Sequence, residues 1–517
     1  MAVLLRDIVL DAAGLPGNWQ EQLPLLAAET LHFPPSEVRS AEILSASVDS
    51  RRGGPRIILT LLAECPAARQ TDEAELAAFT VREPEVPSKT PLKHPLIVGT
   101  GPAGIFAALL LARAGAGPVI VDRGAPVEER VEDYRAFLRT RVLDPESNLL
   151  IGEGGAGTFS DGKLYTGTRD LRAAWVKKVL AECGAPPEIC WRNRAHVGSD
   201  HLAQTAGNLR KRIEALGGRF LFHREVTSLH IVNGVCAGVR CVSGEILEAP
   251  LVLLAPGLGG RELVRGILPL AAWAPKPFQI GCRIEHPQRL VDFAMYHRPR
   301  PAALGAAEYH LVSRRHPRHV ASFCMCPGGE VVNASAWEGR SVSNGMSRFA
   351  RAGEFADSCL IATFQPRELG STGDIDRLLE TMERACFVSG GGDYALPIQS
   401  AAAFLRREGD KGTFPASPAV GVRNARIDRI IPSELFDALS SAVRDFDRRI
   451  PGFIREGRII GVESCVSSPV RIVRDPESME SSLPRLYCAG EGCGEAGGII
   501  SAACDGIRCA EAMLRHP

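Results

Sequence analysis

The chain has 517 residues, and its 60 Lys and Arg residues are balanced by 60 Asp and Glu residues, so the formal net charge is zero. A chain of this length is too long to fold around one hydrophobic core, so we expect two or three domains. The balanced charge indicates no strong binding to nucleic acid or to an anionic membrane. No apolar run reaches the ~20 residues that a membrane-spanning helix needs.

The cysteines and the N-terminus predict the compartment. The 15 cysteines lack the regular spacing of a disulfide framework, and a chain of this length does not depend on disulfide bonds to fold. The first residues, MAVLLRDIVLDAAG, carry acidic side chains where a secretion signal would have an apolar core. We therefore expect reduced thiols in a cytoplasmic protein.

Residues 1–65 predict a small separate unit of β-α-β-β order. The expected elements are strands at 4–10, 38–49 and 55–64 and a helix at 20–31, with a hairpin turn at 50–54. Residues 66–94 follow, with closely spaced prolines that are typical of a linker. The small unit is a candidate docking module.

The stretch 96–123 reads LIVGTGPAGIFAALLLARAGAGPVIVDR and predicts a strand at 96–98, a glycine turn, a helix at 102–113 and a strand at 119–121. In a dinucleotide-binding turn, Gly99 permits the tight bend and Gly101 lets the main chain approach a pyrophosphate. Gly104 lets the helix pack closely on the strand. A tight turn without a ligand is the alternative.

Several residues around this turn are candidate ligand contacts. The helix N-terminus, at Pro102 and Ala103, would direct free N–H groups at a diphosphate. Asp122 lies 23 residues after Gly99 and would accept hydrogen bonds from ribose hydroxyls. We add Arg123 and Arg130, which follow closely on Asp122 and its strand, to this set.

A second glycine-rich loop spans residues 147–165, SNLLIGEGGAGTFSDGKLY, after a polar helix at 127–141. Glycines in a loop cost chain entropy, so this many indicate close approach of the main chain to a ligand. The candidate contacts are Gly154, Gly155, Gly157, Thr158 and Ser160. A flexible lid is the alternative.

The chain then returns to the same predicted sheet. We expect helices at 175–183 and 200–216, strands at 219–222, 226–232, 235–242 and 249–255, and a hairpin at Asn233-Gly234. The last strand ends in Pro256-Gly257-Leu258-Gly259-Gly260, which lacks the spacing of a second nucleotide fingerprint.

Residues 273–450 predict an inserted domain. Strand-like or loop segments at 276–287, 322–335 and 344–351 are followed by amphipathic helices at 374–387 and 433–449. Arg283, Glu285 and Cys326 are our only candidates for catalysis, and a salt-bridged edge and buried core thiols are the alternatives. Cys324-Met325-Cys326 lacks the second cysteine pair of a structural zinc site, so we expect no metal.

The C-terminal stretch predicts a strand at 486–489, a turn at 490–492 and a glycine-led helix at 496–506. A helix N-terminus favours negative charge, so this helix would stabilise charge that develops on a bound ring system. The candidate contacts are Gly490, Glu491, Gly497, Gly498 and Ile499.

Seven phrases in order carry a family resemblance: VGTGPAGIFAA, NLLIGEGGAGTFSDGKL, KPFQIGCRIEHPQ, FCMCPGGEVVNAS, NGMS, SSPVRI and AGEGCGEAGGIISAACDGI. Together they make the chain resemble a bacterial family of FAD-dependent dehydrogenases, or NAD(P)/FAD-dependent oxidoreductases, most of them uncharacterised, within the glutathione-reductase-like FAD-binding superfamily. The resemblance implies FAD as cofactor and oxidoreductase activity.

The resulting fold prediction is α/β. We expect a Rossmann-type FAD-binding domain in two parts, 95–272 and 451–517, with an inserted α+β substrate domain at 273–450 and the small N-terminal α+β domain at 1–65. The expected reaction is hydride transfer between flavin N5 and a small organic substrate, with NAD(P)H as a candidate electron donor. The alternatives are a flavin-binding module for a partner, such as an RNA-modification complex, and a flavin monooxygenase.

Overall fold

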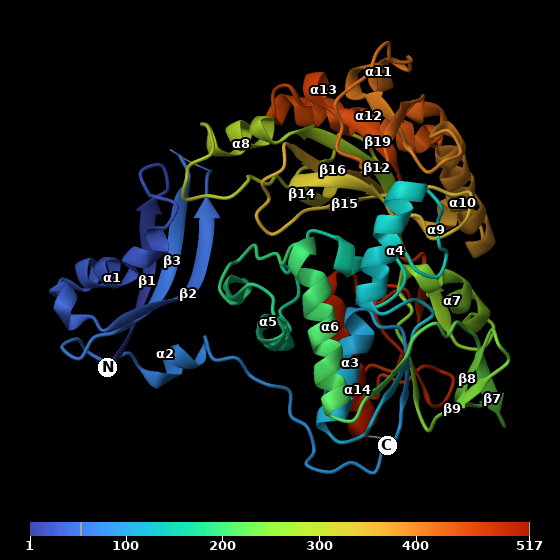
Figure 1. Cartoon of the computed structure of the whole chain (residues 1–517), viewed down its shortest axis with the longest axis horizontal. Coiled ribbons are helices and arrows are strands. Elements are labelled where there is room, and N and C mark those ends of the chain that lie inside the picture. The colour runs from blue at the N-terminus through green and yellow to red at the C-terminus, as the bar shows by residue number, and fades with distance from the viewer. Residues whose placement is uncertain (52–53, 516–517) are drawn as a thin grey trace.

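The computed structural model describes residues 1–51 and 54–515. Its largest sheets are a three-stranded sheet near the N-terminus, a five-stranded parallel sheet and an eight-stranded sheet. Figure 1 shows the N-terminal sheet on one side, with the eight-stranded sheet above the parallel sheet and its helices. The predicted α/β fold class is confirmed.

The N-terminal unit is an antiparallel sheet, in the order β1-β3-β2, with one helix packed against it. Its elements are β1 (Ala2–Asp11), α1 (Leu23–Leu31), β2 (Ser40–Asp49) and β3 (Arg56–Glu64). Alternate residues of β3 from Ile57 to Ala63 are buried, because successive side chains of a strand point to opposite faces. The β-α-β-β order and the β2–β3 hairpin are confirmed, while positions 52 and 53 of its turn lie outside the described residues.

Main-chain bonds tie this unit to the parallel-sheet part of the chain. Ala46 N donates to Trp191 O at 3.0 Å, and Asn193 N donates to Ala46 O at 3.0 Å. Between the two parts, residues 66–94 contain one short helix, α2 (Glu73–Ala77), and are otherwise irregular.

The parallel sheet has the order β21-β10-β4-β5-β6. Its strands are β4 (Leu96–Val98), β5 (Val119–Val121), β6 (Arg219–Leu221), β10 (Val252–Leu254) and β21 (Leu486–Cys488). The chain thus enters this sheet early, in its middle and near its end, as the sequence predicts. We call this sheet with its covering elements the nucleotide lobe.

Both faces of the parallel sheet are covered. Ile97, Ile120 and Leu253 pack against helices, whereas Val98, Val121 and Leu254 pack against a small antiparallel sheet and a short helix. The first face carries α3 (Pro102–Arg113), α5 (Arg172–Glu182), α6 (Ser199–Ala215) and α14 (Ile499–Arg515). The second carries β7 (Val226–Val232), β8 (Val235–Cys241), β9 (Ile246–Glu248) and α7 (Arg261–Ile267). Near-continuous apolar strands are what a sheet buried on both faces requires.

Helix α3 lies at the centre of the nucleotide lobe, and all residues from Ala103 to Ala112 are buried. A helix that is apolar on every side must be enclosed. Helix α14 crosses it closely, since a Cβ at Gly506 would lie 1.9 Å from Ala103 O. The last helix of the chain therefore packs directly on the first helix of the lobe.

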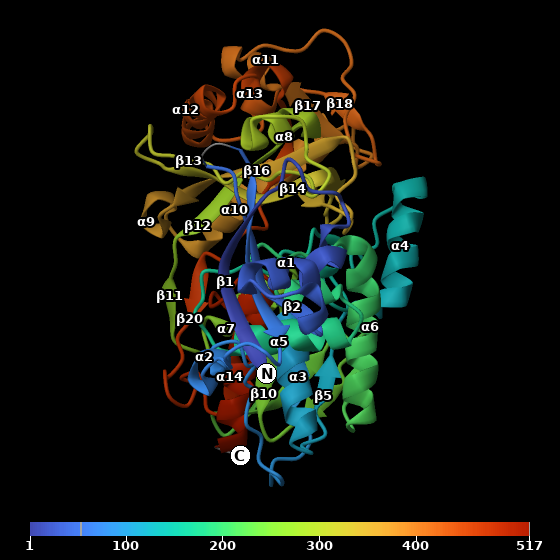
Figure 2. The ribbon, with the colours of Figure 1, turned by 90° about the vertical axis from the view of Figure 1, so that its left-hand side faces the viewer.

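The larger sheet has the order β13-β14-β16-β12-β19-β17-β18, and β15 pairs with β14. Its strands are β12 (Phe278–Pro287), β13 (Val312–Ser313), β14 (Val320–Asn333), β15 (Ser343–Met346), β16 (Phe355–Phe364), β17 (Leu396–Ser400), β18 (Val422–Asn424) and β19 (Arg458–Glu463). Its helices are α8 (Gln288–Tyr296), α9 (Pro366–Leu369), α10 (Thr372–Ser389), α11 (Ala401–Arg406), α12 (Ser433–Arg449) and α13 (Phe453–Glu456). Figure 2 shows α11, α12 and α13 on the side of this sheet that faces away from the nucleotide lobe. We call this part the upper lobe.

The two faces of β12 differ in character. Phe278, Ile280, Cys282 and Ile284 pack in the apolar core with α12, so the alternate residues, from Gln279 to Glu285, turn toward the other side. Helix α4 (Val127–Thr140) extends from the nucleotide lobe to the upper lobe. There its Phe137 packs with residues of β17 and β19. The polar face of the sheet and the nucleotide lobe therefore face each other.

The upper lobe extends beyond residue 450, where the sequence predicts the insert to end. Strand β19 pairs with β12 and β17 in the middle of the sheet, although it follows that boundary. Just outside the sheet, β11 (Trp273–Pro275) pairs antiparallel with β20 (Val470–Ile472). The outgoing and returning strands between the lobes thus form one two-stranded ribbon. No helix in the part of the chain that the structure describes is long and apolar enough to cross a membrane.

Candidate functional site

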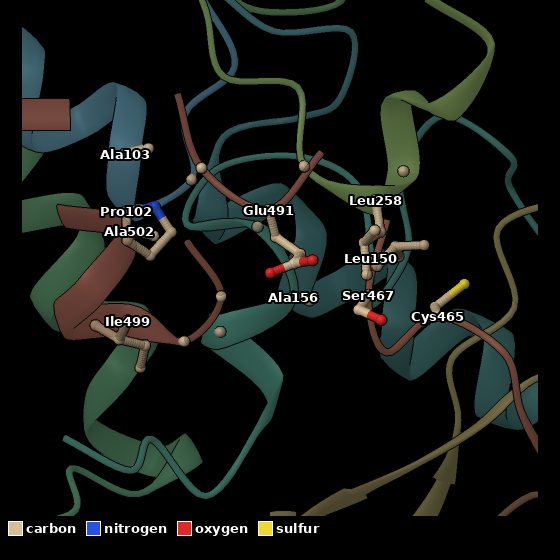
Figure 3. A pocket seen from close by; sticks show the side chains of 18 of the residues that line it. Pro102, Ala103, Leu150, Ala156, Leu258, Cys465, Ser467, Glu491, Ile499 and Ala502 are labelled. Atoms are coloured by element: carbon tan, nitrogen blue, oxygen red, sulfur yellow. The ribbon is translucent and has the colours of Figure 1, made fainter. Parts of the chain in front are cut away.

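A cavity of about 1010 Å³ lies between the two lobes. This volume is at the upper end of the range for small-molecule sites, about 300–1,000 Å³. Three glycine-rich segments of the nucleotide lobe line it, around Gly99, Gly155 and Gly490, and strands β12, β14 and β15 contribute the opposite wall. Figure 3 shows Glu491 between Pro102 and Ile499 on one side and Ser467 and Cys465 on the other.

The first glycine turn has the geometry that a bound diphosphate requires. Gly99 has a φ of 103°, and a Cβ there would lie 2.3 Å from Ala255 O; a Cβ at Gly104 would lie 1.9 Å from Gly99 O. At Gly101 nothing lies within 4 Å of the Cβ position, so that space opens into the cavity. Two glycines are thus needed for packing and the third leaves room for a ligand.

Helix α3 begins at this turn, and no side chain caps its N-terminus at Gly101. The first N–H groups of a helix lack partners within the helix and, with its dipole, favour an anion. Because Gly101, Pro102 and Ala103 line the cavity, these groups suit the pyrophosphate of a dinucleotide.

Asp122 lies at the end of β5 in the cavity wall, as predicted. Its Oδ2 accepts hydrogen bonds from Thr100 N at 2.9 Å and from Thr100 Oγ1 at 2.5 Å, and its Oδ1 accepts one from Gly124 N at 2.8 Å. An ionised carboxylate has about four lone-pair positions. Asp122 is therefore fixed in place and retains one acceptor position for a ribose hydroxyl.

The second glycine loop packs on the first, and Arg130 organises it. A Cβ at Gly155 would lie 3.4 Å from the Cα of Gly101. The guanidinium of Arg130 is fully buried and donates to the carbonyls of Asn148, Glu153 and Gly155. Its burial lowers the pKa of Arg130 to about 10. Arg130, which the sequence suggests as a ligand contact, instead lies behind the loop and holds it.

The third segment, at the start of α14, brings Glu491 into the cavity. The Nζ of Lys276 lies 2.9 Å from Glu491 Oε1, which also accepts a hydrogen bond from Ser468 N at 2.9 Å. Gly490 N donates to Asp505 Oδ2 at 2.9 Å, which ties the turn to α14. The helix N-terminus at Gly498 and Ile499 lines the same cavity.

A buried ion cluster lies in the upper lobe around Arg283. Its Nη1 donates to Asp357 Oδ1 at 2.9 Å, and its Nε lies 2.6 Å from Glu463 Oε2 in an ion pair that is poorly aligned as a hydrogen bond. Burial raises the pKa of Asp357 well above its usual value and that of Glu463 to about 7. One guanidinium thus faces two carboxyl groups, and Glu463 reaches the cavity.

The three residues that the sequence suggests for catalysis lie behind the cavity wall. Arg283, Glu285 and Cys326 are fully buried and do not line the cavity. Glu285 accepts hydrogen bonds from Ser417 and lies 3.7 Å from Arg458, and burial raises its pKa. Arg283 and Glu285 lie on β12 and Cys326 lies on β14, and both strands have a neighbouring strand on each side, so these side chains support the wall from within the sheet.

A second charged group adjoins the cavity at Lys163, which lines it. Its Nζ lies 2.9 Å from Asp161 Oδ2 and 3.7 Å from Cys326 Sγ. Arg351 Nε donates to Asp161 Oδ1 at 2.9 Å, so Asp161 is held between two cations. These cations keep the pKa of the Asp161 carboxyl well below its usual range, although burial alone would raise it.

Most of the predicted cofactor contacts come together in this cavity. Those that line it are Gly99, Gly101, Pro102, Ala103, Asp122, Arg123, Gly155, Gly157, Ser160, Gly490, Glu491, Gly497, Gly498 and Ile499. Those that do not are Gly104, Arg130, Gly154 and Thr158. Gly154 and Thr158 contact each other instead, since a Cβ at Gly154 would lie 2.0 Å from Thr158 Oγ1.

Sequence reasoning missed the polar side chains on the upper-lobe side. Among them are Lys276, Gln279, Cys324, Asn344, Glu463 and Cys465, and Lys163 lines the same cavity from the nucleotide lobe. Lys163 and Cys324 stand within phrases that the sequence analysis quotes, so their motifs were visible. Lys276 also stands in a quoted phrase, KPFQIGCRIEHPQ, whereas Glu463 is the last residue of β19 and no local pattern marks it.

Comparisons with known proteins agree with this geometry. Residues 94–144 match an FAD-binding domain family, and residues 277–466 match a family described as "FAD-dependent protein, C-terminal domain-like". An uncharacterised protein of Clostridium beijerinckii is 36% identical over 505 residues, which cover 94% of each chain.

Solved structures also resemble the chain over about four fifths of its length. CtdE in complex with FAD is 11% identical and covers 82% of this chain and 84% of its own, with a TM-score of 0.34. L-proline dehydrogenase from P. horikoshii is 11% identical and covers 82% of this chain and 94% of its own, with a TM-score of 0.35. Scores this low carry no information on substrate or reaction.

The glycine turn leaves room for a dinucleotide, the family matches cover the start of the nucleotide lobe and almost all of the upper lobe, and the bacterial relative matches 94% of the chain. This chain belongs to the same family as that relative, a family of FAD-dependent proteins, and its cofactor is FAD.

Proposed function

We propose that the protein transfers a hydride between a small organic substrate and FAD in the cavity between its lobes, with NAD(P)H as electron donor. The observation that carries this proposal is a single cavity with two unlike walls. One wall is glycine-rich main chain, which suits a dinucleotide, and the other carries polar and ionisable side chains, which suit a small polar substrate.

The residues of the nucleotide lobe bind and orient. FAD, when bound, supplies the two-electron redox chemistry. The N-terminus of α3 and the loop at Gly155 would hold the pyrophosphate, and Asp122 would hold the ribose. The N-terminus of α14 and the Lys276–Glu491 pair line the same cavity and would contact the ring system.

Glu463 of the upper lobe and Lys163 of the nucleotide lobe are the ionisable groups that we propose for substrate contact. Glu463 has a pKa raised to about 7 by burial, so it holds or releases a proton near neutral pH. Lys163 keeps its positive charge beside Asp161, because the aspartate offsets the effect of burial on its pKa. A substrate in the cavity would thus meet a carboxyl group, Glu463, that can bind or release a proton, and a positive charge on Lys163.

We also propose a domain division that follows the ribbon of β11 and β20. The nucleotide lobe comprises residues 95–275 and 467–517, the substrate domain 276–466, and the N-terminal unit 1–65 is joined by the linker 66–94. This division keeps β19 with the sheet to which it is hydrogen-bonded. Cytoplasmic location and a docking role for residues 1–65 stay predictions from the sequence.

The test begins with the cofactor. The purified protein is expected to be yellow, with flavin absorbance near ~450 nm. Asp122→Asn is expected to weaken FAD binding about tenfold, since it replaces a charged acceptor by a neutral one. The measurement is FAD retention during gel filtration and fluorescence titration of the apoprotein with FAD, with Glu511→Gln, outside the cavity, as a control.

The reaction is tested by anaerobic mixing with NADH or NADPH. Bleaching of the flavin supports the proposed hydride transfer. A flavin that stays oxidised with both donors, in a protein that co-purifies with a macromolecule, contradicts it and favours a binding module. Substrate-dependent oxygen consumption would instead indicate a monooxygenase.

A further inference from the structure

Two cysteines of β14, Cys324 and Cys326, lie where the strand is irregular. Cys324 has a positive φ of 44°, and the pairing of β14 with β16 shifts register between Phe323 and Cys326 and again between Cys326 and Gly329. Cys324 lines the cavity, whereas Cys326 is fully buried behind it. The bulged strand thus presents one thiol to the cavity and keeps the other directly beneath.

The bulge brings the two thiols within reach of each other. In a regular strand, residues two apart are separated by about 6.6 Å, close to the ~6.8 Å upper limit for a disulfide. The register shifts on both sides of Cys326 show that the strand is not regular here. Cys326 Sγ donates to Cys324 O at 3.3 Å, so the Cys326 thiol lies beside Cys324.

Cations surround this pair. Lys163 Nζ lies 3.7 Å from Cys326 Sγ, and Arg283 Nη1 donates to Cys324 O at 2.8 Å. The hydrogen bond from Cys326 and then the positive charge of Lys163 lower the pKa of the Cys324 thiol well below its usual value. Cys465 also lines the cavity, but burial raises its pKa to about 12. The thiolate that is needed for nucleophilic attack is therefore favoured at Cys324.

We propose that Cys324 and Cys326 form a reversible dithiol–disulfide pair that exchanges electrons with FAD and with a dithiol or disulfide compound in the cavity. In the oxidising direction, a bond forms between the Cys324 and Cys326 sulfur atoms, the Cys326 thiol gives up its proton, and one electron pair and that proton pass to FAD. The inference rests on the proposed oxidoreductase function of the same cavity.

The disulfide is reopened by a dithiol substrate. That compound becomes a disulfide, its electron pair returns to the two cysteine sulfurs, and of its two protons one goes to Cys326 and the other to solvent. Cys324, as the cavity-facing sulfur, is the position that such a compound reaches. Cys326 resolves the mixed disulfide from behind.

The test is a thiol-trapping titration of the full-length, FAD-loaded protein. The protein is equilibrated in glutathione buffers of increasing oxidised fraction, quenched with N-ethylmaleimide and digested with trypsin. Cleavage after Arg318 and Arg340 gives a peptide, 319–340, that contains both cysteines and no other. We expect it to pass reversibly from two maleimide groups to none, while the exposed Cys190 forms at most a mixed disulfide with glutathione.

Variants separate the parts of the proposal. Cys326→Ser, or Cys326→Ala if the serine disturbs folding, is expected to leave Cys324 as a stable mixed disulfide with glutathione. Lys163→Gln is expected to slow alkylation of Cys324 at pH 7 about tenfold, because less thiolate is present. An equal change at Cys190 would show general loosening instead and contradict the role of Lys163.

Failure of this inference differs from failure of the proposed function. A 319–340 peptide that carries two maleimide groups in every buffer overturns the redox pair, even when NADH or NADPH bleaches the flavin. A protein without flavin absorbance overturns the proposed function, and the trapping experiment still reports on the two thiols.

Discussion

The two walls of the cavity are built by different means. The wall from the nucleotide lobe is mainly glycine main chain, in which Gly155 packs on Gly101 beside the turn at Gly99. The wall from the upper lobe consists of side chains held by buried ion pairs, such as that between Arg283 and Glu463, which lie 180 positions apart in the chain. Adding a side chain to the glycine wall is therefore expected to weaken ligand binding. Removing a charge from the upper-lobe wall is expected to destabilise the fold.

Removal of a charge from the upper-lobe wall is expected to have the largest effect. Arg283→Met leaves Asp357 and Glu463 buried without their cation, and such an uncompensated pair costs about 3–5 kcal/mol in unfolding free energy. Chemical denaturation measures this loss. Arg289→Met, at a mostly exposed arginine on α8, is the matched control and is expected to change stability by less than about 0.5 kcal/mol.

The charge explanation has its own test. Adding Glu463→Gln to Arg283→Met removes one of the stranded carboxyls and is expected to recover part of the stability. A double variant that is as unstable as the single one would mean that Arg283 acts through packing of its side chain rather than through charge.

Replacing a glycine of the nucleotide-lobe wall by alanine tests whether that glycine is needed for packing or for ligand binding. Gly104→Ala places a Cβ 1.9 Å from Gly99 O and is expected to cost about 1–3 kcal/mol and to abolish FAD binding. Gly101→Ala meets no protein atom within 4 Å, so the apoprotein is expected to melt as the wild type does and yet to bind FAD at least tenfold more weakly.

These two variants are compared by thermal melting without FAD and by titration with it. If Gly101→Ala bound FAD with wild-type affinity, the turn would not approach the ligand, and the function assigned to its open space would be wrong.

The pH dependence of Glu463 is the third effect and is expected in the stability of the protein alone. Burial raises its pKa in the folded protein to about 7, above the ordinary value of 4.5. Its contribution to stability is therefore complete below pH 4.5 and is lost as the pH rises through 7. The difference in unfolding free energy between wild type and Glu463→Gln is expected to fall by about 1–3 kcal/mol between pH 5 and pH 8. A difference that stays constant over this range would place the pKa of Glu463 near its ordinary value.

The same contrast explains what the sequence could predict. The bounds of α3 and α12 follow from local signals, a glycine turn in one case and an apolar period in the other, and the structure confirms them to the residue. The sequence prediction ends the insert at residue 450, before β19, because the partners of β19 on β12 lie 173 to 182 residues earlier in the chain and no local pattern records that pairing.

In the candidate site, the sequence predicts the glycine contacts of the nucleotide lobe but not the side chains of the upper lobe. Fourteen of the eighteen predicted cofactor contacts line the cavity, since a glycine pattern reports directly on main-chain conformation. The sequence suggests Arg283 and Glu285 as candidates for catalysis, but the position of β12 inside the sheet buries both side chains, and no local pattern records that position. Nothing in the sequence marks Glu463 as a site residue, because it joins the site only through the pairing of β19 with β12.

The ribbon of β11 and β20 has an evolutionary consequence. The strand that leaves the nucleotide lobe and the strand that returns to it are hydrogen-bonded neighbours from Trp273 to Pro275 and from Val470 to Ile472. A gene segment spliced in between them begins and ends at adjacent points, so it does not disturb the strand order of the parallel sheet. An insertion at this point can therefore change in length or sequence while the strands that form the nucleotide site keep their neighbours.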